Sequence, residues 1–225
     1  MRQRKQKIVA IIILVVTALT LLLGAFSGTA DAHAGVGGTN PANGASLTAS
    51  PGVISIAFTE AVSTDGKRVQ LLDANGKVLA VTWQQSDGGK RQELRPKKPL
   101  TAGSYAVRWS VTSGDGHIVT GASSFNIKRA DAARKTTRVT LTQGSAKTTL
   151  TLGSNRAGRT KVSITGTTFT GVEFTNKLLG ATLRYNLTAG SATVVLPMRG
   201  TWTVTAVEKP SEYRELRWTG SFKLQ

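Results

Sequence analysis

The sequence predicts an all-β protein with two immunoglobulin-like antiparallel β-sandwich domains behind an N-terminal targeting segment. Past residue 32, apolar side chains alternate over short runs, and no stretch keeps the i, i+3, i+4, i+7 spacing of an amphipathic helix. Prolines and glycine-containing turns separate these runs, as they do between short strands. The chain has 225 residues, enough for two small domains with cores of their own.

Residues 1–32 have the three parts of a secretory signal peptide. A basic start precedes an apolar run over 8–26, and small residues ending in Ala30-Asp31-Ala32 follow, the pattern at which signal peptides are cleaved. We therefore expect cleavage between Ala32 and His33 and export to a periplasmic or extracellular, envelope-associated location. The apolar run is nearly long enough to span a bilayer, so an uncleaved anchor is the alternative.

The first domain is expected over residues 33–128. Its strands are predicted at 53–58, 69–72, 78–83, 105–109 and 124–127. Ile54, Ile56 and Phe58 should share one buried face, and so should Tyr105, Val107 and Trp109. Asn75-Gly76 predicts a hairpin between two of these strands, because both residues tolerate a positive φ.

A polar, alanine-rich stretch over 129–136 is expected to be a linker, and residues 137–225 a second β-sandwich domain. Its strands are predicted at 138–141, 148–152, 161–165, 181–187, 192–196, 201–207 and 216–224. Many of these runs are rich in threonine, which suits half-buried strand surfaces.

Composition excludes several classes of function. The chain has no cysteine, so disulfides, thiolate metal sites and cysteine nucleophiles are excluded. The formal net charge is +17, but the charges are scattered and the chain carries an export signal. We therefore expect no nucleic-acid partner, and only weak attraction to the anionic cell envelope. No catalytic set or phosphate-binding loop is evident, which predicts a protein that is not an enzyme.

The chain has two histidines, and their positions suggest a metal site. Cleavage would make His33 the first residue, so its α-amine and ring could chelate one metal ion. His117 would add a third nitrogen, and Asp115, two residues earlier in a segment taken as extended, would add a carboxylate on the same side. This donor set suits tetragonal Cu(II). Because the amine and the imidazoles must be deprotonated to bind, affinity should fall as the pH drops.

Several segments resemble the CopC copper-resistance family. They cover residues 33–128 and comprise His33-Ala34, Asn40–Leu47, Ser50-Pro51, Ile56–Val62, Val69–Asp73, Asn75-Gly76, Leu100–Trp109 and Asp115–Gly121. The resemblance implies an immunoglobulin-like sandwich that binds Cu(II) through a histidine brace of His33, Asp115 and His117. It also places Glu60 at an acidic position near the metal, where it would act on the ligands rather than bind directly.

Methionine content limits the copper chemistry. Some CopC proteins carry a second, Cu(I) site built from methionine and histidine, but only Met1 and Met198 occur here. We expect one Cu(II) site and no Cu(I) site. The second block resembles YtkA-like β-sandwich domains at Leu152–Gly158 and Leu196–Val204, and Met198 beside Trp202 is expected to pack in its core.

Three functions are consistent with these features. The first is capture or buffering of Cu(II) for copper homeostasis or resistance, or its delivery to a separate CopD-type membrane importer. The second is a histidine-brace copper monooxygenase, which an equatorial carboxylate from Asp115 disfavours because it occupies a position that oxygen needs. The third is an envelope interaction protein without a metal, which follows if the signal is not cleaved and the free amine of His33 is missing.

Overall fold

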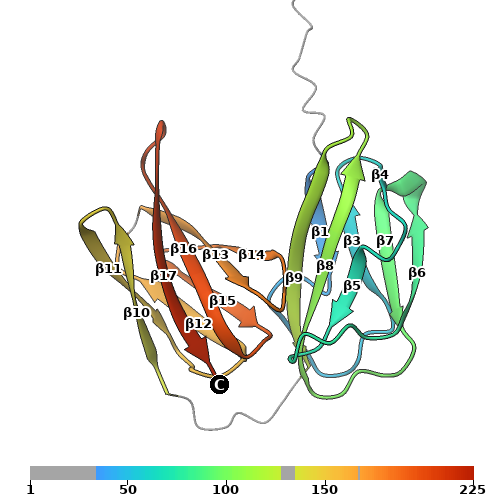
Figure 1. The fold of residues 1–225 in the computed structure, drawn as a ribbon, viewed down its shortest axis with the longest axis horizontal. Coiled ribbons are helices and arrows are strands. Elements are labelled where there is room, and N and C mark those ends of the chain that lie inside the picture. The colour runs from blue at the N-terminus through green and yellow to red at the C-terminus, as the bar shows by residue number, and fades with distance from the viewer. Residues whose placement is uncertain (1–33, 128–134, 167) are drawn as a thin grey trace, which may run out of the picture. The chain divides into compact units, whose positions relative to one another are not determined.

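The computed structural model describes residues 34–127, 135–166 and 168–225. The predicted signal peptide, its cleavage point, His33 and most of the predicted linker lie outside these ranges. Within them, regular structure is β-strand apart from one short 3-10 helix, η1 (Asp87–Gly89), which confirms the all-β prediction (Figure 1). No helix in the described ranges has the length and apolar character needed to cross a membrane.

The first sandwich consists of two layers, in which the strands pair antiparallel except for one short parallel pair, β2 (Ala45–Leu47) with β9 (Ile118–Ile127) (Figure 1). One layer has the strand order β1 (Val36–Asn40), β3 (Ile54–Phe58), β7 (Arg91–Pro96) and β6 (Val81–Ser86). The other is built on the long hairpin of β8 (Gly103–Ser113) and β9 (Ile118–Ile127), to which three short strands pair: β4 (Val62–Ser63), β5 (Val69–Leu72) and β2 (Ala45–Leu47).

The core between these layers contains the predicted apolar faces. Ile54, Ile56 and Phe58 from β3 are at most 4% exposed, and Tyr105, Val107 and Trp109 from β8 at most 6%. The rings of Phe58 and Trp109 meet edge to face, with centroids 6.3 Å apart. Period-two alternation thus identified the inward side chains of both strands.

The prediction at Asn75-Gly76 was right about the turn, but the antiparallel pairing across it is shorter than the predicted hairpin. Gly76 has a φ of +77°, and one bridge joins Leu72 to Val78 across the turn. The strands then separate, because β5 pairs with β8 whereas β6 pairs with β7. The turn therefore carries the chain from one layer to the other, which a local turn signal does not distinguish from a hairpin.

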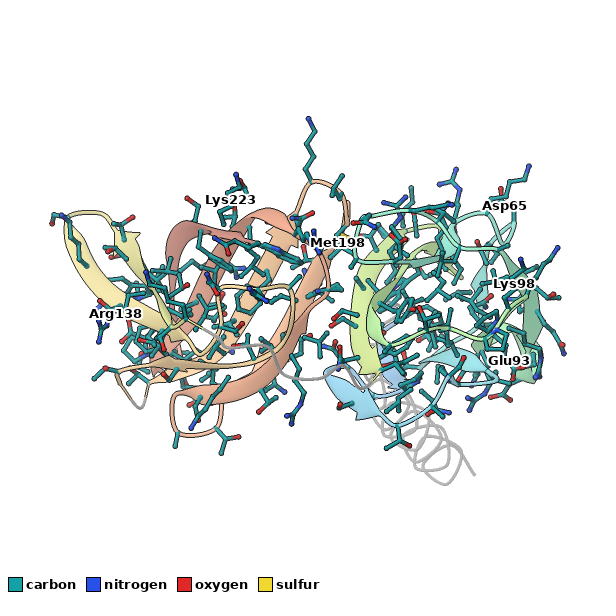
Figure 2. All side chains as sticks on the ribbon, turned by 90° about the horizontal axis from the view of Figure 1, so that it is seen from below. Asp65, Glu93, Lys98, Arg138, Met198 and Lys223 are labelled. Atoms are coloured by element: carbon teal, nitrogen blue, oxygen red, sulfur yellow. The ribbon has the colours of Figure 1, made fainter. Side chains whose placement is uncertain are left out.

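The second sandwich has eight strands in the described ranges. One run has the order β15 (Ser191–Leu196), β12 (Gly158–Ile164), β11 (Ala146–Leu152) and β10 (Thr137–Gln143). The other has the order β17 (Arg214–Leu224), β16 (Gly200–Ser211), β13 (Phe169–Asn176) and β14 (Thr182–Asn186). Met198 is fully buried in this core (Figure 2), and its carbonyl accepts the indole N–H of Trp202 at 2.9 Å, so the expected packing role is confirmed.

Residues of both sandwiches belong to one compact unit. Leu72, Ala106 and Ala122 lie on the outer face of the β5–β8–β9 layer and are buried in the same cluster as Leu179 and Leu183 of the second sandwich. A single parallel bridge joins Ala122 to Leu183. The division of the chain into domains 33–128 and 137–225 stays a prediction.

Candidate metal site

The turn between β8 and β9 carries Asp115 and His117. The N–H of Ser113 donates to the carbonyl of His117, and the N–H of Gly116 donates to the carbonyl of Ser113, each at 2.9 Å. Gly116 has a φ of +86°, in the left-handed region that glycine adopts without steric cost. The long β8–β9 ladder thus ends in a tightly bonded turn.

The side chains of Asp115 and His117 come together within this turn. Nδ1 of His117 lies 2.9 Å from Oδ2 of Asp115, and the backbone N–H of His117 donates to Oδ1 at 3.1 Å. We expected this proximity from strand alternation, and that reason was wrong. Residues 114–116 form a turn, and its curvature brings the two side chains together.

Asp115 is held in its ionised form. The hydroxyl of Ser113 donates to Oδ1, and this bond, followed by the ring and backbone N–H groups of His117, lowers the pKa of Asp115 well below its ordinary value. The His117 side chain is 67% exposed and that of Asp115 is 20% exposed. The turn therefore presents an anionic oxygen beside an accessible imidazole across the neutral and mildly acidic pH range.

The spacing of these two atoms suits shared metal coordination. Neighbouring donors at right angles on a metal ion, each about 2.0 Å from it, are about 2.8 Å apart. The Nδ1–Oδ2 separation of 2.9 Å matches that edge. Because Nδ1 and Oδ2 now face each other across a hydrogen bond, they could bind one ion only after the proton between them is lost and the side chains turn.

The first described residues are fixed at the end of β3. Ala34 is 2% exposed in the core of the first sandwich. The N–H of Gly35 donates to Oγ1 of Thr59 at 2.8 Å, and the N–H of Thr59 donates to the carbonyl of Gly35 at 2.9 Å. The position to which residue 33 is attached is thus set by Thr59.

Pairing between strands brings this segment and the β8–β9 turn to one end of the sandwich. Thr59, bonded to Gly35, lies three residues before Val62, and Val62 pairs with Ser113 in the β4–β8 ladder (Figure 1). Glu60 lies between Thr59 and Val62 in the sequence, and its side chain is half-buried. In the described part of the chain, no three histidine, aspartate, glutamate or cysteine side chains gather as a metal site, so Glu60 does not join Asp115 and His117 in one.

Two residues of this region were missed by sequence reasoning. Ser113 holds Asp115, and Thr59 holds the start of the described chain. A serine two residues before an aspartate in a turn was a usable signal, because short hydroxyl side chains bond locally in turns. Thr59 gave no such signal, because its partner lies 24 residues earlier.

Comparison with known proteins gives a consistent result for the first sandwich. The family model of the CopC domain matches residues 36–128. Copper resistance protein C of Xanthomonas campestris pv. juglandis is 34% identical over 110 residues, which is 45% of this chain and 85% of that protein. Copper resistance protein C of Pseudomonas syringae pv. tomato is 35% identical over 109 residues, covering 45% of this chain and 86% of that protein.

Two further matches differ in coverage. Copper transport protein CutJ of Bacillus subtilis is 29% identical over 115 residues, which is 50% of this chain but 21% of that protein. The crystal structure of CopC from Methylosinus trichosporium OB3b aligns with 27% identity and a TM-score of 0.38, covering 45% of this chain and 99% of that one. On the family match and the extent of the relatives covered, this chain belongs to the CopC family.

Proposed function

We propose that this protein is exported and binds one Cu(II) ion through His33, Asp115 and His117. His33 would contribute its α-amine and ring after cleavage at Ala32, and Glu60 would tune the site without binding the metal. The observation that carries the proposal is the Asp115–His117 pair, whose donor atoms lie 2.9 Å apart at the end of the sandwich where the described chain begins. The first domain, 33–128, would be the metal-binding module, followed by a linker at 129–136.

The donor set favours Cu(II) over other ions and over Cu(I). Three nitrogens and one carboxylate oxygen in a plane match the tetragonal preference of Cu(II). The lowered pKa of Asp115 keeps that oxygen anionic, and a hard anion stabilises the higher oxidation state. The relatives named for copper resistance support copper as the cargo.

We infer binding rather than catalysis as the role of the site. If Asp115 binds the ion together with the histidines, its carboxylate would take a position that oxygen needs, and the site would hold copper rather than activate oxygen. The protein would buffer copper or deliver it to a separate CopD-type membrane importer, and the transport name of one relative supports delivery. Location in the periplasm or at the outer cell envelope follows from the predicted export signal.

The proposal is tested by expressing the full chain in a secreting host and analysing the exported product. Mass spectrometry should give a protein that starts at His33 and carries one copper ion after Cu(II) loading and dialysis. His33→Ala and His117→Ala should each remove that ion, with the secondary structure unchanged by circular dichroism. Copper retained by both variants, or a product that keeps residues 1–32, would refute the proposed site.

A further inference from the structure

We propose a second binding site, a basic groove that takes a linear anion carrying several phosphate groups. The groove has a volume of about 930 Å³ and is lined by both sandwiches. The first sandwich contributes the loop from β7 to β8 and the start of β8, and the second contributes the turn between β11 and β12 and the residues near Arg199. This volume is near the upper end of the range for ligand pockets, so it suits a ligand with several groups.

The charged side chains that line the groove are almost all basic. Lys97 and Lys98 come from the first sandwich, and three arginines come from the second: Arg156, Arg159 and Arg199. Asp73 is the one acidic side chain among the described lining residues, and its Oδ1 is engaged by the N–H groups of Asn75 and Lys77, each at 2.9 Å. The groove therefore gathers positive charge from a chain whose other charges are dispersed.

Contacts between the sandwiches hold the two walls of the groove. The hydroxyls of Ser124 and Tyr185 lie 2.6 Å apart in buried surroundings, and that of Ser124 also donates to the carbonyl of Val195 at 2.7 Å. Nearer the groove, a Cβ built on Gly158 would lie 3.4 Å from Oγ of Ser104. A ligand would therefore meet cationic groups whose relative positions are already set, which lowers the entropic cost of binding.

The groove is separate from the proposed copper site. Its lining includes Tyr105 and Asn126, near the start of β8 and the end of β9. Asp115 and His117 lie at the other end of the same hairpin, and the eight residue steps from Tyr105 to Ser113 span about 26 Å of extended strand. Loss of one site should leave the other unchanged, so the two proposals can fail independently.

The chemistry of the lining points to phosphate groups on a chain. The planar guanidinium groups of the arginines bind phosphate oxygens in pairs, and the lysines add compact positive charges. Between them the groove has apolar surface from Leu79, Leu100 and Pro99, which suits an aliphatic stretch between successive charges. Both an inorganic polyphosphate and an organic chain of alternating polyol and phosphodiester units have repeated phosphates, and the experiment distinguishes them.

The test is calorimetric titration of the protein with three probes at fixed ionic strength: tripolyphosphate, a short poly(glycerol phosphate), and citrate. Each groove variant, Lys97→Ser/Lys98→Ser and Arg156→Ser/Arg199→Ser, should weaken the better phosphate probe by about tenfold or more, because each loses two charge-assisted contacts. The control Arg138→Ser/Lys147→Ser removes the same charge at exposed positions on β10 and β11 that do not line the groove (Arg138 is labelled in Figure 2), and it should change affinity less than threefold.

The results of these titrations distinguish specific binding in the groove from non-specific electrostatic attraction to the basic protein. A preference for tripolyphosphate or for the glycerol phosphate chain, lost in both groove variants, supports the proposal and identifies the source of the phosphates. An equal loss in the control variant would overturn it, as would citrate binding as tightly as either phosphate probe. An unaffected lysine variant would also overturn it, because the ligand would then contact one sandwich only. Circular dichroism and Cu(II) titration of each variant show that the fold and the proposed copper site are intact.

Discussion

The acidic side chains of the two sandwiches are held in different ways. Glu173, on β13 of the second sandwich, accepts a bond from Nε of Arg184 at 3.1 Å and also contacts Arg217. Asp115, in the first sandwich, is held by the hydroxyl of Ser113 and by His117. Arginine keeps its proton at any physiological pH, whereas an imidazole can release its proton and offer a lone pair. The first arrangement is an ion pair on a sheet, and the second is the pair for which we propose exchange of a proton for a metal ion.

The largest effect on Cu(II) affinity is expected when the imidazole of His117, which distinguishes the two arrangements, is removed. His117→Ala should lower Cu(II) affinity by more than about 100-fold, because loss of even an indirect partner of a metal ligand typically costs 10–100-fold. Competition against a chelator of known affinity measures the change. A loss below tenfold would show that His117 is not a ligand.

A second prediction concerns Tyr185, where burial rather than hydrogen bonding dominates. Burial raises the pKa of Tyr185 to about 12, against about 10 in an unfolded chain. Between those values the unfolded state loses the proton and the folded state keeps it, so stability falls as the pH rises. The two-unit shift predicts a loss of about 2–3 kcal/mol that is complete above pH 12.

Urea unfolding of wild type and Tyr185→Phe at pH 8 and pH 11.5 measures this loss. The variant lacks the bonds to Ser124 and Val195, so it should be less stable at pH 8. The gap should narrow at pH 11.5, because only wild type has the ionising phenol. A constant gap would contradict the assignment.

A third prediction concerns Ser113, whose hydroxyl holds the carboxylate of Asp115. Ser113→Ala removes the hydroxyl that contributes most to lowering the pKa of Asp115, so that pKa should rise and the carboxylate should be less firmly oriented. We expect about tenfold weaker Cu(II) binding at pH 7, and a larger deficit near pH 4. Affinity measured over that pH range checks both parts, and a deficit that does not grow on acidification would contradict the account.

A smaller effect is expected at Thr59, which acts on the position of His33. Thr59→Val removes the hydroxyl that accepts the N–H of Gly35 at 2.8 Å, and should weaken Cu(II) binding by about three- to tenfold by loosening the chain start. Thr59→Ser keeps the hydroxyl and should restore wild-type affinity. Equal affinities for the valine and serine variants would show that the hydroxyl does not position the ligand.

The smallest effect is expected at Glu173. The side chains of its arginine partners are 61% and 49% exposed, and exposed ion pairs contribute at most about 1 kcal/mol. Glu173→Gln should therefore lower the free energy of unfolding by less than about 1 kcal/mol and leave Cu(II) affinity unchanged. A change in copper affinity would show that the second sandwich influences the metal site in the first, contrary to our proposal.

Two of the strands that sequence reasoning missed, β7 and β13, lack a continuous apolar alternation, each for its own reason. In β7, Gln92 is fully buried and Leu94 is the one large apolar residue facing the core, so the segment does not show an apolar alternation. In β13, Phe169 and Val172 are both buried, and an irregularity between Phe169 and Gly171 shifts the register. Such an irregularity resets the period-two pattern on which prediction depends.

The candidate site was predictable to the extent that it is local. Asp115 and His117 lie two residues apart, and their chemistry is visible in the sequence even though the turn that joins them was not foreseen. The link from Thr59 to Gly35 and the pairing of Val62 with Ser113 depend on strand order. Non-local pairing of this kind is fixed by the whole fold, so no short motif carries it.

The central claim is that the free amine of His33 is a copper ligand, and one titration tests it directly. Protein starting at His33 and protein with one extra alanine before it are titrated with Cu(II), following tryptophan fluorescence and the EPR spectrum. We expect tight 1:1 binding with a tetragonal signal for the first protein, and binding weakened by at least about 100-fold with an altered signal for the second. Equal affinities and identical spectra would contradict the histidine brace.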